Sequence, residues 1–86
     1  MEYKALRVTV VDKLDWDGHP AGQLVHLKDM QGKPADWMMG CPACETPLTL
    51  QHDVLVLEGK ATITPSIVCT VCGAHFTVTG GVVQPD

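Results

Sequence analysis

Four cysteines carry the clearest chemistry in the sequence, and they come as two C-x-x-C pairs. The pairs are separated by 24 residues and include every cysteine of the chain. Zn²⁺ is satisfied by four thiolates in a tetrahedron, and each C-x-x-C turn presents two thiolates from one bend of the backbone. Two such turns facing each other complete the shell, so we predict one structural zinc ion held by Cys41, Cys44, Cys69 and Cys72.

The residues beside the two pairs suit metal-binding turns. Gly73 follows Cys72 and can take a positive φ angle, which lets backbone N–H groups point at the sulfurs. Glu45 occupies the equivalent position after the first pair, and Pro42 stiffens that first turn.

These residues could also serve three other kinds of site. His75 could replace one cysteine as a ligand, although four available thiolates make the all-cysteine shell the simpler prediction. A thiol redox motif needs its first cysteine at the N-terminus of a helix, but Pro47 and a β-type alternation follow the first pair. A catalytic zinc ion keeps one position open for water, and four cysteines leave none. We therefore expect a protein that is not an enzyme.

Length and composition favour a small domain that needs a metal. A single domain of 86 residues buries only about 60–65% of its unfolded surface, so a staple is expected. Two disulfides are the alternative staple, but the amino terminus has no apolar signal core, and we expect the reducing cytosol. No apolar run approaches the roughly 18–20 residues that span a membrane. The net charge of −4 and the scattered basic residues argue against a general nucleic-acid binder.

Short β-strands are expected along most of the chain, because β-branched and apolar residues alternate between Gly and Pro. The first strand is expected over residues 3–11, with Leu6, Val8 and Val10 on its core face, and it forms a hairpin with a second strand over 23–28. Later strands are expected at 48–52, 54–57, 61–68, 75–79 and 82–84. Residues 54–57 are apolar throughout, so this strand is either covered on both sides or paired at an interface. Pro65 places its strand at a sheet edge or in a bulge.

These elements predict a mainly β fold. We expect a small zinc ribbon over residues 37–86 and a β-hairpin extension over residues 1–36, together forming one domain.

Two tryptophans and a methionine pair are candidates for contact with a partner. Trp16 lies in a predicted loop and is either such an anchor or a lid over the core. Trp37 precedes the first cysteine pair and is expected in the core or as a shield of the metal site. Met38 and Met39 form either a soft contact surface or a pair in which one side chain points inward.

The second half of the chain also resembles a known family. Thr64-Pro65-Ser66-Ile67 precedes the second cysteine pair, and His75-Phe76 and Gly80-Gly81 follow it. This segment is similar to an uncharacterised bacterial and phage zinc-ribbon family, and the similarity extends from Cys41 onward. The resemblance implies a metal-bound, β-rich ribbon. It also implies that Ser66 and His75 form either a polar network that braces the metal turns or a functional surface.

The function that these observations favour is a non-enzymatic, zinc-stabilised module that binds a protein partner or a second copy of itself. A nucleic-acid-binding zinc ribbon that gathers Lys28, Lys33 and Lys60 into one patch is the alternative. A thiol redox enzyme or a metal-dependent enzyme is favoured less.

Overall fold

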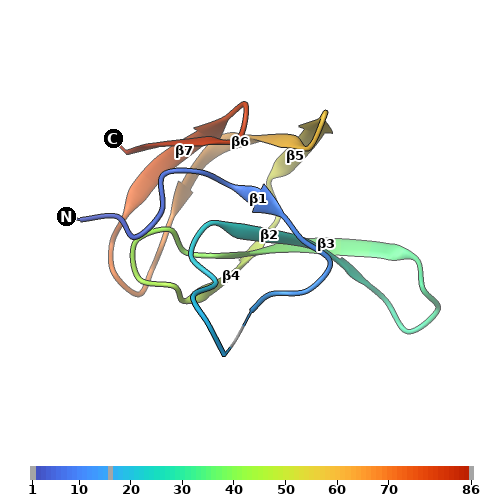
Figure 1. Cartoon of the computed structure of the whole chain (residues 1–86). Helices are drawn as coiled ribbons and strands as arrows, with labels where there is room; N and C mark the ends of the chain where they lie inside the picture. The colour runs from blue at the N-terminus through green and yellow to red at the C-terminus, as the bar shows by residue number, and fades with distance from the viewer. Residues whose placement is uncertain (1, 16, 86) are drawn as a thin grey trace.

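The computed structural model describes residues 2–15 and 17–85, and these residues form two four-stranded sheets (Figure 1). The strands of the first sheet, in spatial order, are β1 (Thr9–Val10), β2 (Gln23–Lys28), β3 (Pro34–Gly40) and β4 (Pro47–Leu50). Those of the second are β5 (Asp53–Leu57), β6 (Lys60–Val68), β7 (His75–Thr79) and β8 (Val82–Pro85). The predicted mainly β fold is confirmed. In the part of the chain described, no helix has the length and apolarity that crossing a membrane would need.

The two sheets and the cysteine turns share one hydrophobic core. Its most deeply buried side chains come from all three parts of the structure: Leu24, Met39, Cys41, Ile63, Cys69 and Phe76. Two of the four cysteines are thus core residues as well as candidate ligands. The two cysteine turns are therefore part of the core of this short chain.

The expectation of one long strand over residues 3–11 is wrong. Only Thr9–Val10 forms a strand, and it pairs with β2 in parallel, so the two do not form a hairpin. Leu6, expected on the core face, is 54% exposed, whereas Val8 is buried.

The backbone of this N-terminal segment hydrogen bonds to three different parts of the molecule. The N–H of Lys4 donates to Pro42 O in the first cysteine turn at 2.7 Å, and the N–H of Val8 donates to Gly81 O at 2.8 Å. Further along, the N–H of Val11 donates to β2. The segment therefore ties the two sheets and the metal turn together, which explains why it does not continue as one strand.

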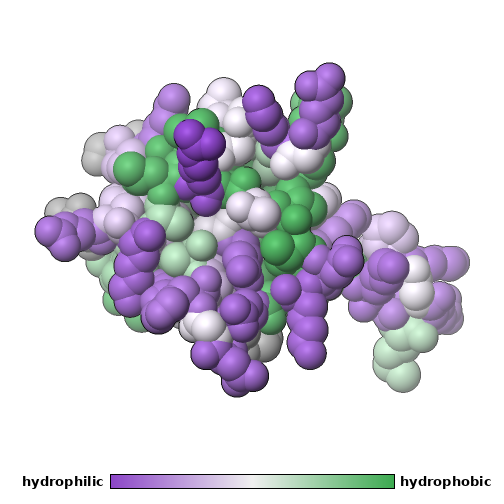
Figure 2. All heavy atoms as spheres, in the orientation of Figure 1, coloured by the Kyte–Doolittle hydropathy of each residue, from purple (hydrophilic) through white to green (hydrophobic). Residues whose placement is uncertain are grey.

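The hairpin of the first sheet is formed by β2 and β3, which pair antiparallel and project from the body of the molecule (Figure 1). The face of this projection seen in Figure 2 is mostly hydrophilic. At its base, the rings of His26 and Trp37 stack at 4.1 Å between centroids. β3 includes residues on both sides of the predicted boundary between the extension, residues 1–36, and the ribbon, residues 37–86.

Both tight turns predicted in the second half are confirmed. Glu58 and Gly59 have φ angles of 53° and 77°, and Gly80 and Gly81 have φ angles of 57° and 78°. Positive φ at both central residues is the signature of a two-residue turn that matches the twist of a hairpin. Each turn therefore joins adjacent antiparallel strands.

Two strand predictions need correction. Pro65 lies in β6, which is a central strand, and the pairing with β7 shifts register between Ile63 and Ile67. The bulge alternative is therefore confirmed, and the sheet-edge alternative is wrong. β5 lies at the edge of its sheet with Leu55 and Leu57 exposed, so the described residues do not cover it on both sides.

Candidate metal centre

The two cysteine turns have the same backbone geometry. In the first, the N–H of Glu45 donates to Cys41 O, and in the second the N–H of Gly73 donates to Cys69 O, both at 2.8 Å. Glu45 and Gly73 also share a left-handed conformation, with φ angles of 68° and 80°. The positive φ predicted at Gly73 is confirmed, and the first turn adopts it with a residue that pays a steric cost.

These turns bring the four cysteine sulfurs together. All four Sγ atoms lie within 4.8 Å of one another. The Sγ atoms of Cys41 and Cys72 are 3.9 Å apart, and those of Cys44 and Cys69 are 3.7 Å apart. A disulfide requires about 2.05 Å, whereas four sulfurs about 2.3 Å from one central ion are about 3.8 Å apart in a tetrahedron. The donor set therefore fits one tetrahedral metal ion.

The protein environment shifts the pKa values of the two thiols of the first turn in opposite directions. Burial raises the pKa of Cys41 to about 12, even though backbone N–H groups donate to its sulfur. Burial acts in the same direction on Cys44, but hydrogen bonds from Thr46 and the neighbouring thiols bring the pKa of Cys44 down to about 6. Cys44 is thus the sulfur of this turn that loses its proton more readily, and a bound metal ion would deprotonate both.

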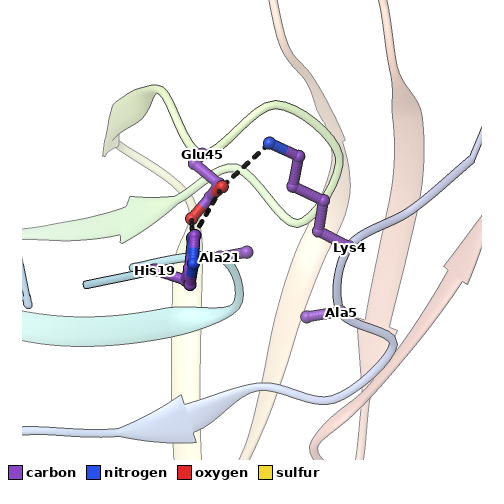
Figure 3. A pocket seen from close by; sticks show the side chains of 5 residues that line it. All are labelled: Lys4, Ala5, His19, Ala21 and Glu45. Atoms are coloured by element: carbon purple, nitrogen blue, oxygen red, sulfur yellow. Dashed lines mark hydrogen bonds and ion pairs between the residues drawn. The ribbon is translucent and has the colours of Figure 1, made fainter.

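A charged cluster lies beside the first turn and lines a pocket of about 450 Å³ (Figure 3). The Glu45 carboxylate accepts from Lys4 Nζ at 2.9 Å and lies 3.2 Å from His19 Nδ1. The hydrogen bond from Lys4 lowers the pKa of Glu45, and Glu45 raises that of Lys4. The carboxylate therefore links the N-terminal segment and the loop before β2 to the first cysteine turn.

Sequence reasoning did not identify this cluster. The available signal was Glu45 itself, a side chain at the position where the second turn has glycine. Its partners Lys4 and His19 are 41 and 26 residues away in the chain, so no local pattern connects them.

Ser66 and His75, grouped by the family resemblance, are in contact. Ser66 Oγ and His75 Nε2 are 2.8 Å apart, and Ser66 O accepts a hydrogen bond from His52 Nε2 at 3.1 Å. The pair lies at the two ends of the second cysteine turn, since Ser66 precedes Cys69 and His75 follows Cys72. His75 lies outside the group of four cysteines whose sulfurs are close enough to hold one ion.

The candidate contact residues lie in different environments. Met39 is fully buried and Met38 is half-buried, which is the arrangement with one methionine pointing inward. A partner could therefore reach Met38 but not Met39. Trp37 packs against the core cluster from a half-buried position, and Trp16 lies outside the described residues.

The fold and the site together define a small, mainly β domain with four cysteines placed to bind a metal ion. Comparison with protein-family models, curated proteins and solved structures finds no match to this chain. The resemblance to the bacterial and phage zinc-ribbon family stays a prediction.

Proposed function

We propose that this chain is a non-enzymatic, zinc-stabilised module that binds a protein partner, either another protein or a second copy of itself. The observation that carries the proposal is the set of four cysteine sulfurs within 4.8 Å of one another. A catalytic zinc ion keeps an open position for water or substrate, and a shell of four thiolates has none. The metal then serves the fold, and the surface of the fold carries the function.

Zinc is the metal that this donor set favours. Two C-x-x-C turns that present four thiolates at tetrahedral spacing are typical of structural zinc sites. A reducing compartment such as the cytosol keeps such thiols available for metal binding.

Exposed apolar side chains support protein binding as the role of the surface. Several large hydrophobic residues are more than half exposed: Leu6, Met30, Leu55, Leu57, Val68 and Val71. Two of them, Leu55 and Leu57, lie on the same face of β5, where they offer adjacent apolar area to a partner. The net charge of −4 disfavours a polyanionic partner.

The proposal is tested by asking whether binding and folding both depend on zinc. The chain is purified without added metal, its zinc content is measured by native mass spectrometry, and strand content is followed by circular dichroism during chelation. We expect one zinc ion per chain and loss of the β signal on its removal, because a structural zinc site contributes about 10 kcal/mol to folding.

Binding is then tested with purified components. A partner captured by the zinc-loaded chain should bind again when the two purified proteins are mixed. It should not bind the Cys69→Ser variant, which lacks one metal ligand. A chain that folds fully without metal, or a partner that binds the metal-free chain equally well, contradicts the proposal.

A further inference from the structure

The second sheet has one edge that the chain covers and one that it leaves open. At the β8 edge, the N–H of Val83 donates to Leu6 O and the N–H of Val8 donates to Gly81 O, both at 2.8 Å. At the opposite edge, β5 pairs with β6, and no strand of residues 2–15 or 17–85 lies beyond it (Figure 1). The N-terminal segment thus protects one edge and leaves β5 available.

β5 is the open edge best suited to pairing. It is five residues long and contains neither Lys nor Pro, the residues that most often protect an edge strand. The edges of the first sheet are poorer templates, because β1 has two residues and β4 begins with Pro47.

Two observations identify which backbone groups of β5 point outward. The two-residue turn at Glu58–Gly59 pairs its flanking residues, Leu57 and Lys60, through hydrogen bonds. On the next strand, Ala61 O accepts from Gly81 N–H, so the polar groups of Ala61 point away from β5. Val56 lies opposite Ala61, and its N–H and C=O therefore point out of the sheet edge. By alternation along the strand, those of Val54 do the same.

The side chains of β5 divide between two faces. Val54 and Val56 pack against the core, whereas Leu55 and Leu57 are 57% and 63% exposed on the outer face. The strand therefore combines free hydrogen-bonding groups at its edge with uncovered apolar area beside them.

We propose that a second copy of this chain pairs its β5 with this β5, antiparallel and centred on Leu55. In this register, Val54 lies opposite Val56 of the second copy, so the residues whose backbone groups point outward meet and form about four hydrogen bonds. Leu55 lies opposite Leu55 of the second copy in the closely spaced, non-hydrogen-bonded position. Asp53 lies opposite Leu57 of the second copy, so no like charges face each other. The proposal rests on the proposed function and names the partner as a second copy.

Edge pairing over five residues makes a small interface, well below the roughly 1,600 Å² of a standard complex. The dimer is therefore expected to have a dissociation constant in the micromolar range or weaker, and it must be sought at high concentration. Sedimentation velocity of the zinc-loaded chain from about 10 µM to about 1 mM covers this range.

Leu55→Lys tests the interface, with Leu6→Lys as its matched control. Both leucines are similarly exposed, at 57% and 54%, but Leu6 lies on the segment that covers the opposite edge. Leu55→Lys puts two like charges directly opposite each other, so the dissociation constant should rise at least about tenfold. Leu6→Lys should change it by less than about twofold, because it lies outside the interface.

Amide hydrogen exchange of the unmodified chain gives a second test that needs no variant. The amides of Val54 and Val56 should exchange slowly at high concentration and quickly at low concentration, whereas that of Leu55, bonded to β6, should be slow at both.

A zinc-loaded chain that is monomeric at about 1 mM overturns the dimer and leaves the proposed function standing. A dimer that Leu6→Lys weakens and Leu55→Lys does not, or one that leaves the amides of Val54 and Val56 unprotected, also overturns it. If a segment of another protein pairs with β5 in place of a second copy, the amides of Val54 and Val56 are protected only when that protein is added. This result also overturns the dimer. A chain that dimerises through β5 but holds no zinc contradicts the proposed function alone.

Discussion

Glu45 adopts at the first cysteine turn the backbone conformation that Gly73 adopts at the second. A side chain in the left-handed region carries a steric cost that glycine avoids. The carboxylate of Glu45 contacts Lys4 and His19, so the strained residue also connects the first turn to two other segments. The two turns are thus equivalent in geometry but not in what they hold together.

Substitution of Glu45 separates these two effects. Glu45→Ala and Glu45→Gly both lose the carboxylate, so the difference in their free energies of unfolding reports the backbone alone. We expect the glycine variant to be more stable by about 1 kcal/mol, measured by denaturation with zinc in excess. Gly73→Ala is the corresponding experiment at the second turn. Apart from its chain neighbours, no residue that the structure describes lies within 4 Å of a Cβ there, so this variant should lose a similar amount. An alanine variant at least as stable as the glycine variant would show that position 45 is not strained.

The zinc affinity of a cysteine variant can be compared with that of a variant of the nearby His75. Cys69 is fully buried in the sulfur cluster, so Cys69→Ser should weaken zinc binding by more than about 100-fold. His75 contacts Ser66 and lies outside the donor set, so His75→Gln should cost no more than about tenfold. Competition with a chromophoric chelator measures both affinities. If His75→Gln abolishes binding, a shell of three cysteines and one histidine replaces the all-cysteine shell.

At the scale of strands and turns, the sequence predicted best where the signals are local. The turns at Glu58–Gly59 and Gly80–Gly81 and the bulge at Pro65 follow from residues adjacent in the chain. The alternation of Leu6, Val8 and Val10 is also a local signal, but the strand that it predicts over residues 3–11 does not form. The backbone partners of that segment are Pro42, Gly81 and β2, and nothing within the segment encodes them.

The cysteine cluster was predictable because the spacing of each pair fixes its own turn, and metal geometry leaves few ways to join two such turns. The Glu45 cluster was not predictable, because its contacts depend on how distant loops pack. The exposure of β5 was not predictable either. Its run of apolar residues is compatible with burial, and only the order of strands places it at an edge.

Gly40 joins β3 to the first cysteine turn and packs against the loop before β2. A Cβ at Gly40 would overlap the Pro20 carbonyl oxygen, so Gly40→Ala must move that loop. We expect a loss of about 2 kcal/mol in the free energy of unfolding, measured by denaturation of the zinc-loaded protein.

Gly32→Ala is the control for this substitution. A Cβ at Gly32 would meet no described residue within 4 Å apart from its chain neighbours, and the φ angle of Gly32 is 80°. The variant should therefore lose only about 1 kcal/mol, from backbone strain. Equal losses at the two positions would mean that the Pro20 loop moves without cost.

At the scale of the whole molecule, charge and shape argue against a nucleic-acid ribbon. Lys28 and Lys33 flank the tip of the β2–β3 hairpin, and Lys60 follows the β5–β6 turn, which Figure 1 places apart from that tip. The three lysines therefore do not gather into one patch.

Titration with mixed-sequence duplex and single-stranded DNA at low salt should consequently show no saturable binding below about 100 µM. Tight binding that falls steeply with added salt would restore the nucleic-acid alternative.

The central claim is that four sulfurs from two distant turns hold one zinc ion and thereby complete a core too small to fold alone. X-ray absorption at the zinc edge of the purified protein tests it most directly, because it counts the atoms around the metal. The expected result is one shell of four sulfur scatterers at about 2.3 Å. A shell containing nitrogen or oxygen, or a folded protein with no zinc to measure, would contradict the claim.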